Sequence, residues 1–360
     1  MFKIINIQGL GVAGRQNELI ELALTYKFNA VEIDMEDLVA RHDAMGREFA
    51  CQFLLSAKMD VGTFQLPIDL GADDATYATA CEKLDTIFDL AKELNCSRCY
   101  VQIETSSETP FQENFERHRL RLHDLGTKFA AHEMKIGLAL QSPSATEKEN
   151  KFVQTAEEIL TLVKTVGQSN VGLFLDTWQW AASGGAMDQI ADLSGDQIIE
   201  TRLADVPADA DPANLNKSDR KLPGEEENSL SVKVFEHLKS INYDGPVSVA
   251  TSLGTFGRSN RNRVVSKISR RIEQLMNGEE LKDEYIKLAF EEEYQNQRAR
   301  REARNNPDAA AKTEDGDKDK DKDKDKAKAD GEAAKTDDAS AEKTEEAKTE
   351  GEATAAAATE

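Results

Sequence analysis

The chain has 360 residues, a formal net charge of −22 and a pI near 4.8, so no basic surface would bind nucleic acid by displacing its counterions. It has no apolar run of about 18 residues, which argues against a transmembrane helix and a membrane partner. Four cysteines are too few for a disulfide framework and the first apolar stretch is too short for a secretory signal, so we expect a cytoplasmic protein.

Short apolar runs alternate with longer amphipathic segments over residues 1–277. Eight runs predict strands, at residues 3–7, 30–34, 61–66, 98–103, 135–140, 171–175, 198–203 and 247–249. Segments with apolar residues every three or four positions predict helices, among them 16–26, 76–94, 115–132, 155–166, 230–241 and 260–276. Eight strand–helix repeats, spaced by about 35 residues, predict a closed α/β (β/α)8 TIM barrel, with an open doubly wound sheet as the alternative.

Two charged segments follow the predicted barrel. Residues 278–306 place acids before arginines, an order that suits a helix dipole and predicts a charged helical extension. Residues 307–360 hold 18 acidic residues and 10 lysines, a net charge of −8, and leave −14 for residues 1–306. The last segment contains no Leu, Ile, Val, Phe, Met, Trp or Tyr, so burial cannot offset the entropy of ordering and we predict a disordered tail.

Polar residues gather at the C-terminal ends of the predicted strands, where a (β/α)8 barrel places its reactive groups. Glu32, Glu104, Asp176 and Arg202 are the candidates among them for a base, an acid or an electrophile. An apolar core would not hold so many polar groups at strand ends, because unpaired buried polar groups are unstable. The sequence therefore predicts a polar pocket at the mouth of the barrel.

Residues 173–185, with the sequence LFLDTWQWAASGG, resemble the sixth strand and following loop of the sugar phosphate isomerase/epimerase family, a xylose isomerase-like TIM barrel. Segments at 28–33, 203–207, 221–226 and 243–249 resemble the same family, and the resemblance covers about residues 1–277. It implies one divalent cation, often manganese, held by a Glu, an Asp, a His and a Glu from strands five to eight. In such enzymes two carboxylates shuttle a proton beside a carbonyl that the metal polarises.

The residues at these four family positions are Gln141, Asp176, Arg202 and Ala250, so a single carboxylate remains. A hard cation needs several oxygen or imidazole ligands, and the permanent charge of an arginine repels it. We therefore expect no metal and no other cofactor, and a divalent cation (Mn, Co, Mg or Zn) only if the family site still functions.

A charge replacement follows from this pattern. We hypothesise that the Arg202 guanidinium takes the place of the cation and pairs with Asp176, and with Glu32 or Glu104 as well, because its planar fork can bridge two carboxylates. The alternative is that Arg202 points to solvent.

The predicted ligand-binding residues are Gln141, Trp178, Gln179 and Asp205. Gln179 stands three residues after Asp176, where the family has its His, and Asp205 is retained from the family pattern. Trp178 either stacks on the apolar face of a sugar or packs in the core. Residues 207–228, rich in Asp, Pro, Asn and Lys, predict a surface loop beside the mouth that is a lid or is disordered.

Three functions remain open from the sequence, which leaves undecided whether the protein is an enzyme. The favoured one is a non-catalytic or altered-function family member, with a degenerate metal site, that binds a small sugar or polyol. The second is a metal-independent isomerase or epimerase that acts on a keto-sugar or keto-polyol by carboxylate proton transfer, with Arg202 as electrophile. The third is an ordinary metal-dependent isomerase. The resemblance also allows a homo-oligomer.

Overall fold

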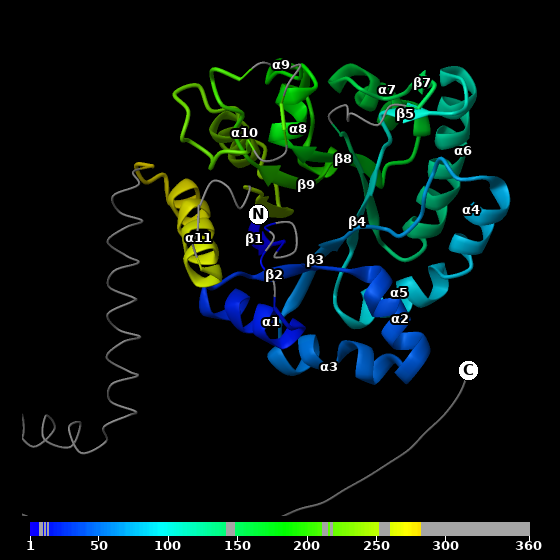
Figure 1. The fold of residues 1–360 in the computed structure, drawn as a ribbon, viewed down its shortest axis with the longest axis horizontal. Coiled ribbons are helices and arrows are strands. Elements are labelled where there is room, and N and C mark those ends of the chain that lie inside the picture. Colours follow the sequence, from blue (N-terminus) through cyan, green and yellow to red (C-terminus); the bar gives the residue numbers. More distant parts are fainter. Residues whose placement is uncertain are drawn as a thin grey trace, which may run out of the picture. The chain divides into compact units, whose positions relative to one another are not determined.

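The computed structural model describes residues 1–6, 10, 12, 14–141, 148–210, 215–216, 219–251 and 260–281. Eight parallel strands form a nearly closed barrel, which confirms the predicted fold class (Figure 1). Each begins within one residue of a predicted apolar run. The strands are β1 (Phe2–Ile5), β2 (Ala30–Ile33), β3 (Asp60–Phe64), β4 (Arg98–Gln102), β6 (Lys135–Ala139), β8 (Val171–Asp176), β9 (Ile198–Leu203) and β10 (Pro246–Val249).

The strands close on themselves instead of forming an open sheet. Their order is β3-β2-β1-β10-β9-β8-β6-β4, and every neighbouring pair is parallel. The two ends of this order meet where Gln65 bridges to Tyr100 and the Leu66 N–H donates to the Tyr100 carbonyl at 2.8 Å. The carboxyl ends of all eight strands therefore lie at one end of the barrel, as a parallel arrangement requires.

Helices pack around the outside of the barrel (Figure 1). They are α1 (Gln16–Thr25), α2 (Met35–Met45), α3 (Arg47–Ala57), α4 (Asp74–Cys81), α5 (Leu84–Glu93), α6 (Phe111–Ala130), α7 (Ala156–Val166), α8 (Thr177–Ala182), α9 (Asp188–Ala191), α10 (Leu230–Ser240) and α11 (Arg261–Asn277), with a short 3-10 helix η1 (Gly195–Gln197). A small antiparallel sheet pairs β5 (Ser106–Ser107) with β7 (Asn150–Lys151). None of the helices in the described part of the chain is both long and apolar enough to cross a membrane.

The structure divides one predicted helix into two. The single helix predicted over residues 76–94 is interrupted at residues 82–83, because α4 has no buried residue whereas α5 buries five and packs on the barrel.

The predicted helix of 278–306 and the tail of 307–360 lie outside the described residues from residue 282 onward. Before that point, α11 ends at Asn277 and is capped by Gly278, whose φ of 66° is the left-handed conformation typical of a helix end.

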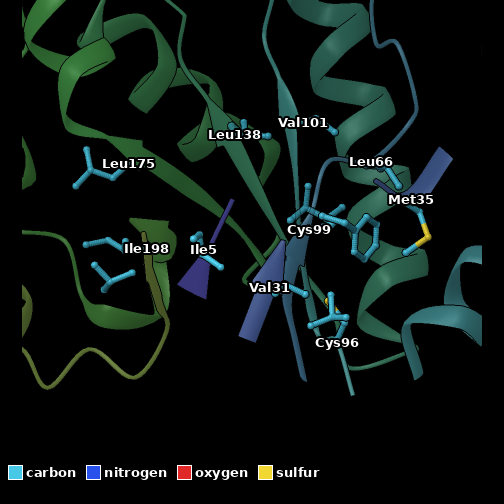
Figure 2. Close-up of a cluster of buried hydrophobic side chains, with 14 of the residues drawn as sticks. Ile5, Val31, Met35, Leu66, Cys96, Cys99, Val101, Leu138, Leu175 and Ile198 are labelled. Atoms are coloured by element: carbon cyan, nitrogen blue, oxygen red, sulfur yellow. The ribbon is translucent and has the colours of Figure 1, made fainter. Parts of the chain in front are cut away.

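An apolar core fills the space between the strands and the helices (Figure 2). Ile5, Leu138 and Leu175 are at most 1% exposed and come from three different strands. All six residues of β8 are buried, as expected for a parallel strand that is covered on both sides. Cys96 and Cys99 belong to this core, and burial raises the pKa of the Cys96 thiol to about 12, so these thiols pack as small apolar groups.

The strand that carries Asp176 approaches its neighbour closely at Gly172. A Cβ atom added to Gly172 would lie 2.4 Å from the carbonyl oxygen of Gln197, a backbone atom that cannot rotate away. The register between β8 and β9 shifts one residue later, between Leu173 and Phe174, and from there on the two strands pair through to Asp176 and Arg202. Glycine at position 172 therefore permits the approach that aligns the two strand ends.

We expect Gly172→Ala to lower the free energy of unfolding by about 1–3 kcal/mol, because the added methyl group forces β8 and η1 apart. The matched control is Gly195→Ala in η1, where the added Cβ would meet its nearest atom, Tyr243 Cα, at an ordinary 3.4 Å. This control should change stability by less than about 1 kcal/mol. Urea denaturation of both variants measures the difference, and equal stabilities for the two would contradict the close approach.

Candidate functional site

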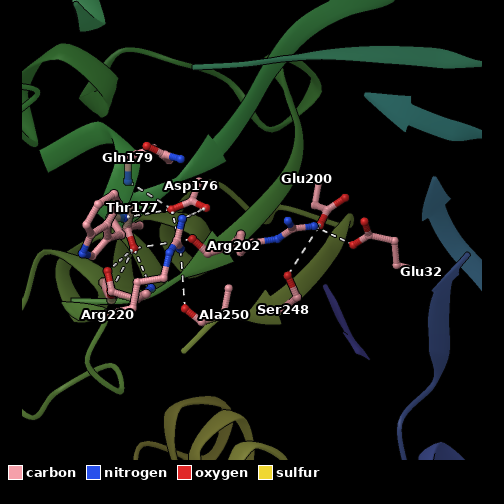
Figure 3. Close-up of polar contacts among 12 residues, drawn as sticks. Glu32, Asp176, Thr177, Gln179, Glu200, Arg202, Arg220, Ser248 and Ala250 are labelled. Carbon is pink, nitrogen blue, oxygen red and sulfur yellow. Dashed lines mark hydrogen bonds and ion pairs between the residues drawn. The ribbon is translucent and has the colours of Figure 1, made fainter. Parts of the chain in front are cut away.

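The ladder between β8, β9 and β10 places three polar side chains on one face at the barrel mouth. Asp176 is the register partner of Arg202, and Arg202 is in turn the partner of Ser248. Register partners on neighbouring strands project their side chains to the same side of the sheet. Arg202 therefore lies between Asp176 and Ser248 along the ladder, and all three face the barrel interior (Figure 3).

Arg202 reaches across the barrel to a carboxylate on β2. Its Nη2 donates to Glu32 Oε2 at 2.5 Å and to Glu200 Oε1 at 3.3 Å. The guanidinium carbon lies 4.8 Å from the ring centre of Phe174, a contact in which the aromatic face attracts the cation. Burial disfavours the charge, but the nearby carboxylates, Glu32 foremost, hold the pKa of Arg202 well above its usual range. The site therefore contains a fixed positive charge, only 12% exposed, at all physiological pH values.

Tyr100 completes the contacts of Glu32. Its hydroxyl donates to Glu32 Oε1 at 2.7 Å, so each oxygen of this carboxylate accepts one hydrogen bond. Burial and the charge of Glu32 raise the pKa of Tyr100 far above its ordinary value. The phenol therefore remains protonated and serves as a donor.

Glu200 lies deeper in the barrel and is fully buried. Burial raises its pKa to about 8, although Arg202 and Thr63 act in the opposite direction. Ser248 Oγ donates to Glu200 Oε1 at 3.5 Å. Glu200 was not among the predicted site residues. The sequence does contain a signal for it: Glu200 stands two positions before Arg202, and residues two apart on a strand share a face, so Glu200 points into the barrel as Arg202 does.

A second arginine holds Asp176. Arg220 Nη1 and Nη2 donate to Asp176 Oδ1 and Oδ2 at 3.1 and 2.9 Å, a bidentate pair (Figure 3). Asp176 Oδ1 also accepts the backbone N–H groups of Trp178 and Gln179, both at 3.1 Å, so it caps the first turn of α8. Arg220 lies in the connection between β9 and α10, and its guanidinium carbon is 4.8 Å from the Trp178 ring centre.

The hypothesis about Arg202 is therefore correct in one part and wrong in another. Arg202 pairs with Glu32, one of the two alternatives, and does not point to solvent. The expected pair with Asp176 is wrong, because Arg220 occupies both carboxylate oxygens. Glu104 is not a partner of Arg202 either, since Lys148 Nζ donates to its Oε2 at 2.7 Å.

Arg220 was missed because no strand or helix period applies to residues 207–228. Of that predicted lid the structure describes residues 207–210, 215–216 and 219–228, and the last of these segments is tied to the barrel. Lys221 exchanges two backbone hydrogen bonds with Asp205 at 2.9 and 3.0 Å. Asp205 Oδ2 accepts the Gly224 N–H at 2.7 Å, and Oδ1 accepts the Ser229 hydroxyl at 2.8 Å. Asp205 thus anchors the connection that carries Arg220.

The remaining predicted ligand-binding residues occupy different surroundings. Gln141 Nε2 donates to Gln102 Oε1 at 3.2 Å at the barrel mouth. Trp178 is fully buried, and the Arg220 guanidinium lies against it. Gln179 lies in α8 and is 6% exposed. The backbone carbonyl of Ala250 accepts a hydrogen bond from Arg220 at 3.5 Å.

Two adjoining cavities open at the mouth, and we call them the mouth cavities. One has a volume of about 390 Å³ and is lined by residues that include Glu32, Tyr100 and Arg202. The other has a volume of about 320 Å³ and is lined by residues that include Glu104 and Gln141. They share Gln65, Pro67 and Gln102. The structure thus brings Glu32 and Arg202 to one cavity, and Glu104 and Gln141 to the next.

Within the described ranges, no group of three or more His, Cys, Asp or Glu side chains converges as a metal site would require. At the four positions where the resemblance implies metal ligands, the structure has the amide of Gln141, the Asp176 carboxylate bound by Arg220, the Arg202 guanidinium and the methyl group of Ala250.

The eight-stranded parallel barrel, with polar residues at its strand ends, defines a TIM-barrel protein. Residues 20–274 match the family described as xylose isomerase-like TIM barrel, and the chain belongs to this family. It is 25% identical over 246 residues to the 3-dehydroshikimate dehydratase of Pseudomonas aeruginosa. That match covers 68% of this chain but only 37% of the length of the relative.

Solved structures show the same fold. A xylose isomerase domain protein from Alicyclobacillus acidocaldarius superposes with a TM-score of 0.69 at 18% identity, covering 77% of this chain and 98% of its own. The probable 3-DHS dehydratase AsbF from Bacillus anthracis superposes with a TM-score of 0.59 at 16% identity, covering 76% of this chain and 99% of its own. At these identities the likeness concerns the fold.

The buried Glu200 makes a prediction about pH. Its pKa in the folded state lies above that of an exposed glutamate, so the folded state binds one more proton between about pH 5 and 8. The stability that this proton contributes is complete below that range and is lost as the pH rises through about 8. The side chain of Glu200→Gln stays neutral at every pH, so this variant lacks the decrease in stability as the pH rises.

Relative to Glu200→Gln, we expect the wild type to lose about 1–3 kcal/mol of unfolding free energy as the pH rises from about 5.5 to about 8.5. Urea denaturation of both proteins at the two pH values measures this difference. Glu21→Gln, at an exposed position of α1, is the control and should show no such trend. A constant difference for Glu200→Gln would show that Glu200 is ionised throughout.

Proposed function

We propose that this chain is a xylose isomerase-like barrel that binds a small sugar- or polyol-like molecule in its mouth cavities without a divalent metal. In this proposal the metal-assisted proton transfer of the family is lost. One observation carries it: arginine–carboxylate pairs include Asp176 and Arg202, two of the four positions at which the resemblance implies metal ligands. Arg220 binds both oxygens of Asp176, and Arg202 is paired with Glu32.

The donor set supports the absence of a metal. A divalent cation would have to displace Arg220 from Asp176 and then find further oxygen or imidazole ligands. The nearest alternatives at the family positions are an amide and a methyl group, from Gln141 and Ala250. Arg202 would repel the ion from a position one strand away from Asp176. The residues present therefore do not fit the metal.

The chemistry of the mouth cavities supports a neutral, hydroxyl-rich ligand. Amide side chains from Gln65, Gln102 and Gln141 line them, and each amide can both donate to and accept from a hydroxyl group. Volumes of about 390 and 320 Å³ lie in the range of small-molecule sites. The charge of Arg202 is already matched by Glu32, so the described residues that line the mouth cavities offer no surplus cation for a phosphate.

Metal-independent isomerisation or epimerisation is the second candidate, and one observation favours it. Glu32, Tyr100 and Arg202 line the same cavity, so a base, a proton donor and an electrophile are within reach of one ligand. Against it, both oxygens of Glu32 already accept hydrogen bonds, which weakens it as a base. Turnover of a bound keto-sugar or keto-polyol would favour this second candidate.

Metal analysis tests the first part of the proposal. Protein purified without chelator should contain well below one Mn, Co, Mg or Zn per chain, and added Mn²⁺ should leave its melting temperature unchanged, because no donor set on the described residues favours the ion. Elemental analysis by mass spectrometry and a thermal-shift assay give these values. About one tightly held transition metal per chain would overturn the proposal.

A ligand screen tests the second part. The panel holds sugars, polyols, their phosphates and 3-dehydroshikimate, the compound in the name of the curated relative, and we expect at least one neutral sugar or polyol to raise the melting temperature. Gln102→Ala should weaken its binding by about three- to tenfold, because Gln102 lines both mouth cavities. Gln112→Ala, on the exposed surface of α6, is the matched control. A panel without effect, or equal affinity in both variants, would contradict the assigned pocket.

A further inference from the structure

The mouth of the barrel contains an arginine that does not bond to the acid nearest to it in the strand ladder. Asp176 and Arg202 are register partners on adjacent strands. Glu32 lies on β2, which is separated from β9 by β1 and β10. Arg202 nevertheless extends away from Asp176 and donates to Glu32 at 2.5 Å (Figure 3). Something must therefore make Asp176 a poor partner for Arg202.

Arg220 provides that cause. It binds both oxygens of Asp176, and the backbone N–H groups of Trp178 and Gln179 add two further donors to Oδ1. A carboxylate with two guanidinium bonds and two amide bonds has its charge matched and little remaining capacity to accept from a second arginine. Asp176 and Arg220 are both at least nine-tenths buried, so water does not replace this pairing.

The position of Arg220 is itself fixed by contacts on both sides of it. Its guanidinium lies against the Trp178 ring and donates to the Ala250 carbonyl at 3.5 Å. The chain after it is held by the bonds between Lys221 and Asp205, and by Arg271 of α11, which donates to the Pro223 carbonyl. The connection between β9 and α10 thus delivers Arg220 to Asp176 in one orientation.

We propose that Arg220 is a positioning residue: by neutralising Asp176 it directs the Arg202 guanidinium to Glu32 and so keeps this cation at the wall of the larger mouth cavity. Without Arg220, a buried carboxylate would remain unpaired beside Arg202, and a buried unpaired charge is strongly unfavourable. Arg202 would turn from Glu32 to Asp176, because Glu32 lines the open cavity, where water can hydrate it, and keeps the Tyr100 hydroxyl, whereas Asp176 lines neither mouth cavity. The cavity would then lose its cation. The proposal concerns which acid Arg202 bonds, so it does not depend on the identity or the existence of a ligand.

The test is a set of four full-length proteins: the wild type, Arg220→Gln, Asp176→Asn and the double variant Arg220→Gln/Asp176→Asn. Crystal structures, and the side-chain Nε–Hε NMR resonance of Arg202, report the partner of Arg202 in each. In Arg220→Gln we expect the Arg202 guanidinium within hydrogen-bond distance of Asp176 and no longer of Glu32, and an Nε–Hε resonance shifted from the wild type. In Asp176→Asn and in the double variant we expect it on Glu32, because the competing charge is gone.

The double variant separates positioning from a purely structural role. If Arg220 only held the connection in place, neutralising Asp176 would not restore the melting temperature that Arg220→Gln loses. We expect Arg220→Gln to lower the melting temperature by several degrees and the double variant to recover at least about half of that loss. If Arg220→Gln fails to fold while the double variant folds, the neutralising role is supported by that rescue. Arg202 remaining on Glu32 in Arg220→Gln, or a double variant no more stable than Arg220→Gln, would overturn the proposal.

Discussion

Charge pairing inside a low-dielectric barrel is the constraint on which the mouth of this protein depends. Two arginines and three carboxylates lie there, and a buried charge is stable only when another charge or several hydrogen bonds match it. Arg202 faces Glu32 and Arg220 faces Asp176, which leaves Glu200 as the surplus acid. Burial raises its pKa to about 8, so Glu200 is mainly protonated at neutral pH and does not add a full negative charge to the two pairs.

The two ion pairs depend on different parts of the fold. Glu32 and Arg202 both belong to strands, so their pair follows from barrel closure, which brings together residues 170 positions apart. Arg220 belongs to a connection, and its pair with Asp176 requires that this connection be anchored. Asp205 supplies the anchor through bonds to the residues that follow Arg220, and α8 supplies a second constraint by using Asp176 as its N-cap. The mouth is therefore built by strands on one side and by a tied connection on the other.

These two origins explain how much could be predicted from the sequence. All eight strands were predictable because a helix-covered parallel strand is apolar along nearly its whole length. The inward direction of Arg202 follows from period-two alternation, and the same alternation would have identified Glu200 two residues earlier. Arg220 could not be found this way, because a connection has no period and its direction is set by tertiary contacts. The Arg202–Asp176 pair was wrong for that same reason, since it was predicted without knowledge of Arg220.

A guanidinium and a divalent cation place charge in similar positions but differ in what they can do to a ligand. A metal ion accepts an oxygen lone pair, polarises a carbonyl and lowers the pKa of bound water. An arginine donates directional hydrogen bonds in one plane and holds its charge on a covalent tether. In this barrel much of that capacity is already used, because Arg202 serves Glu32, Glu200 and the ring of Phe174. Under the proposed function, a ligand that enters the mouth meets a cation that can orient one oxygen but supplies little polarisation, an arrangement better suited to recognition than to moving a proton.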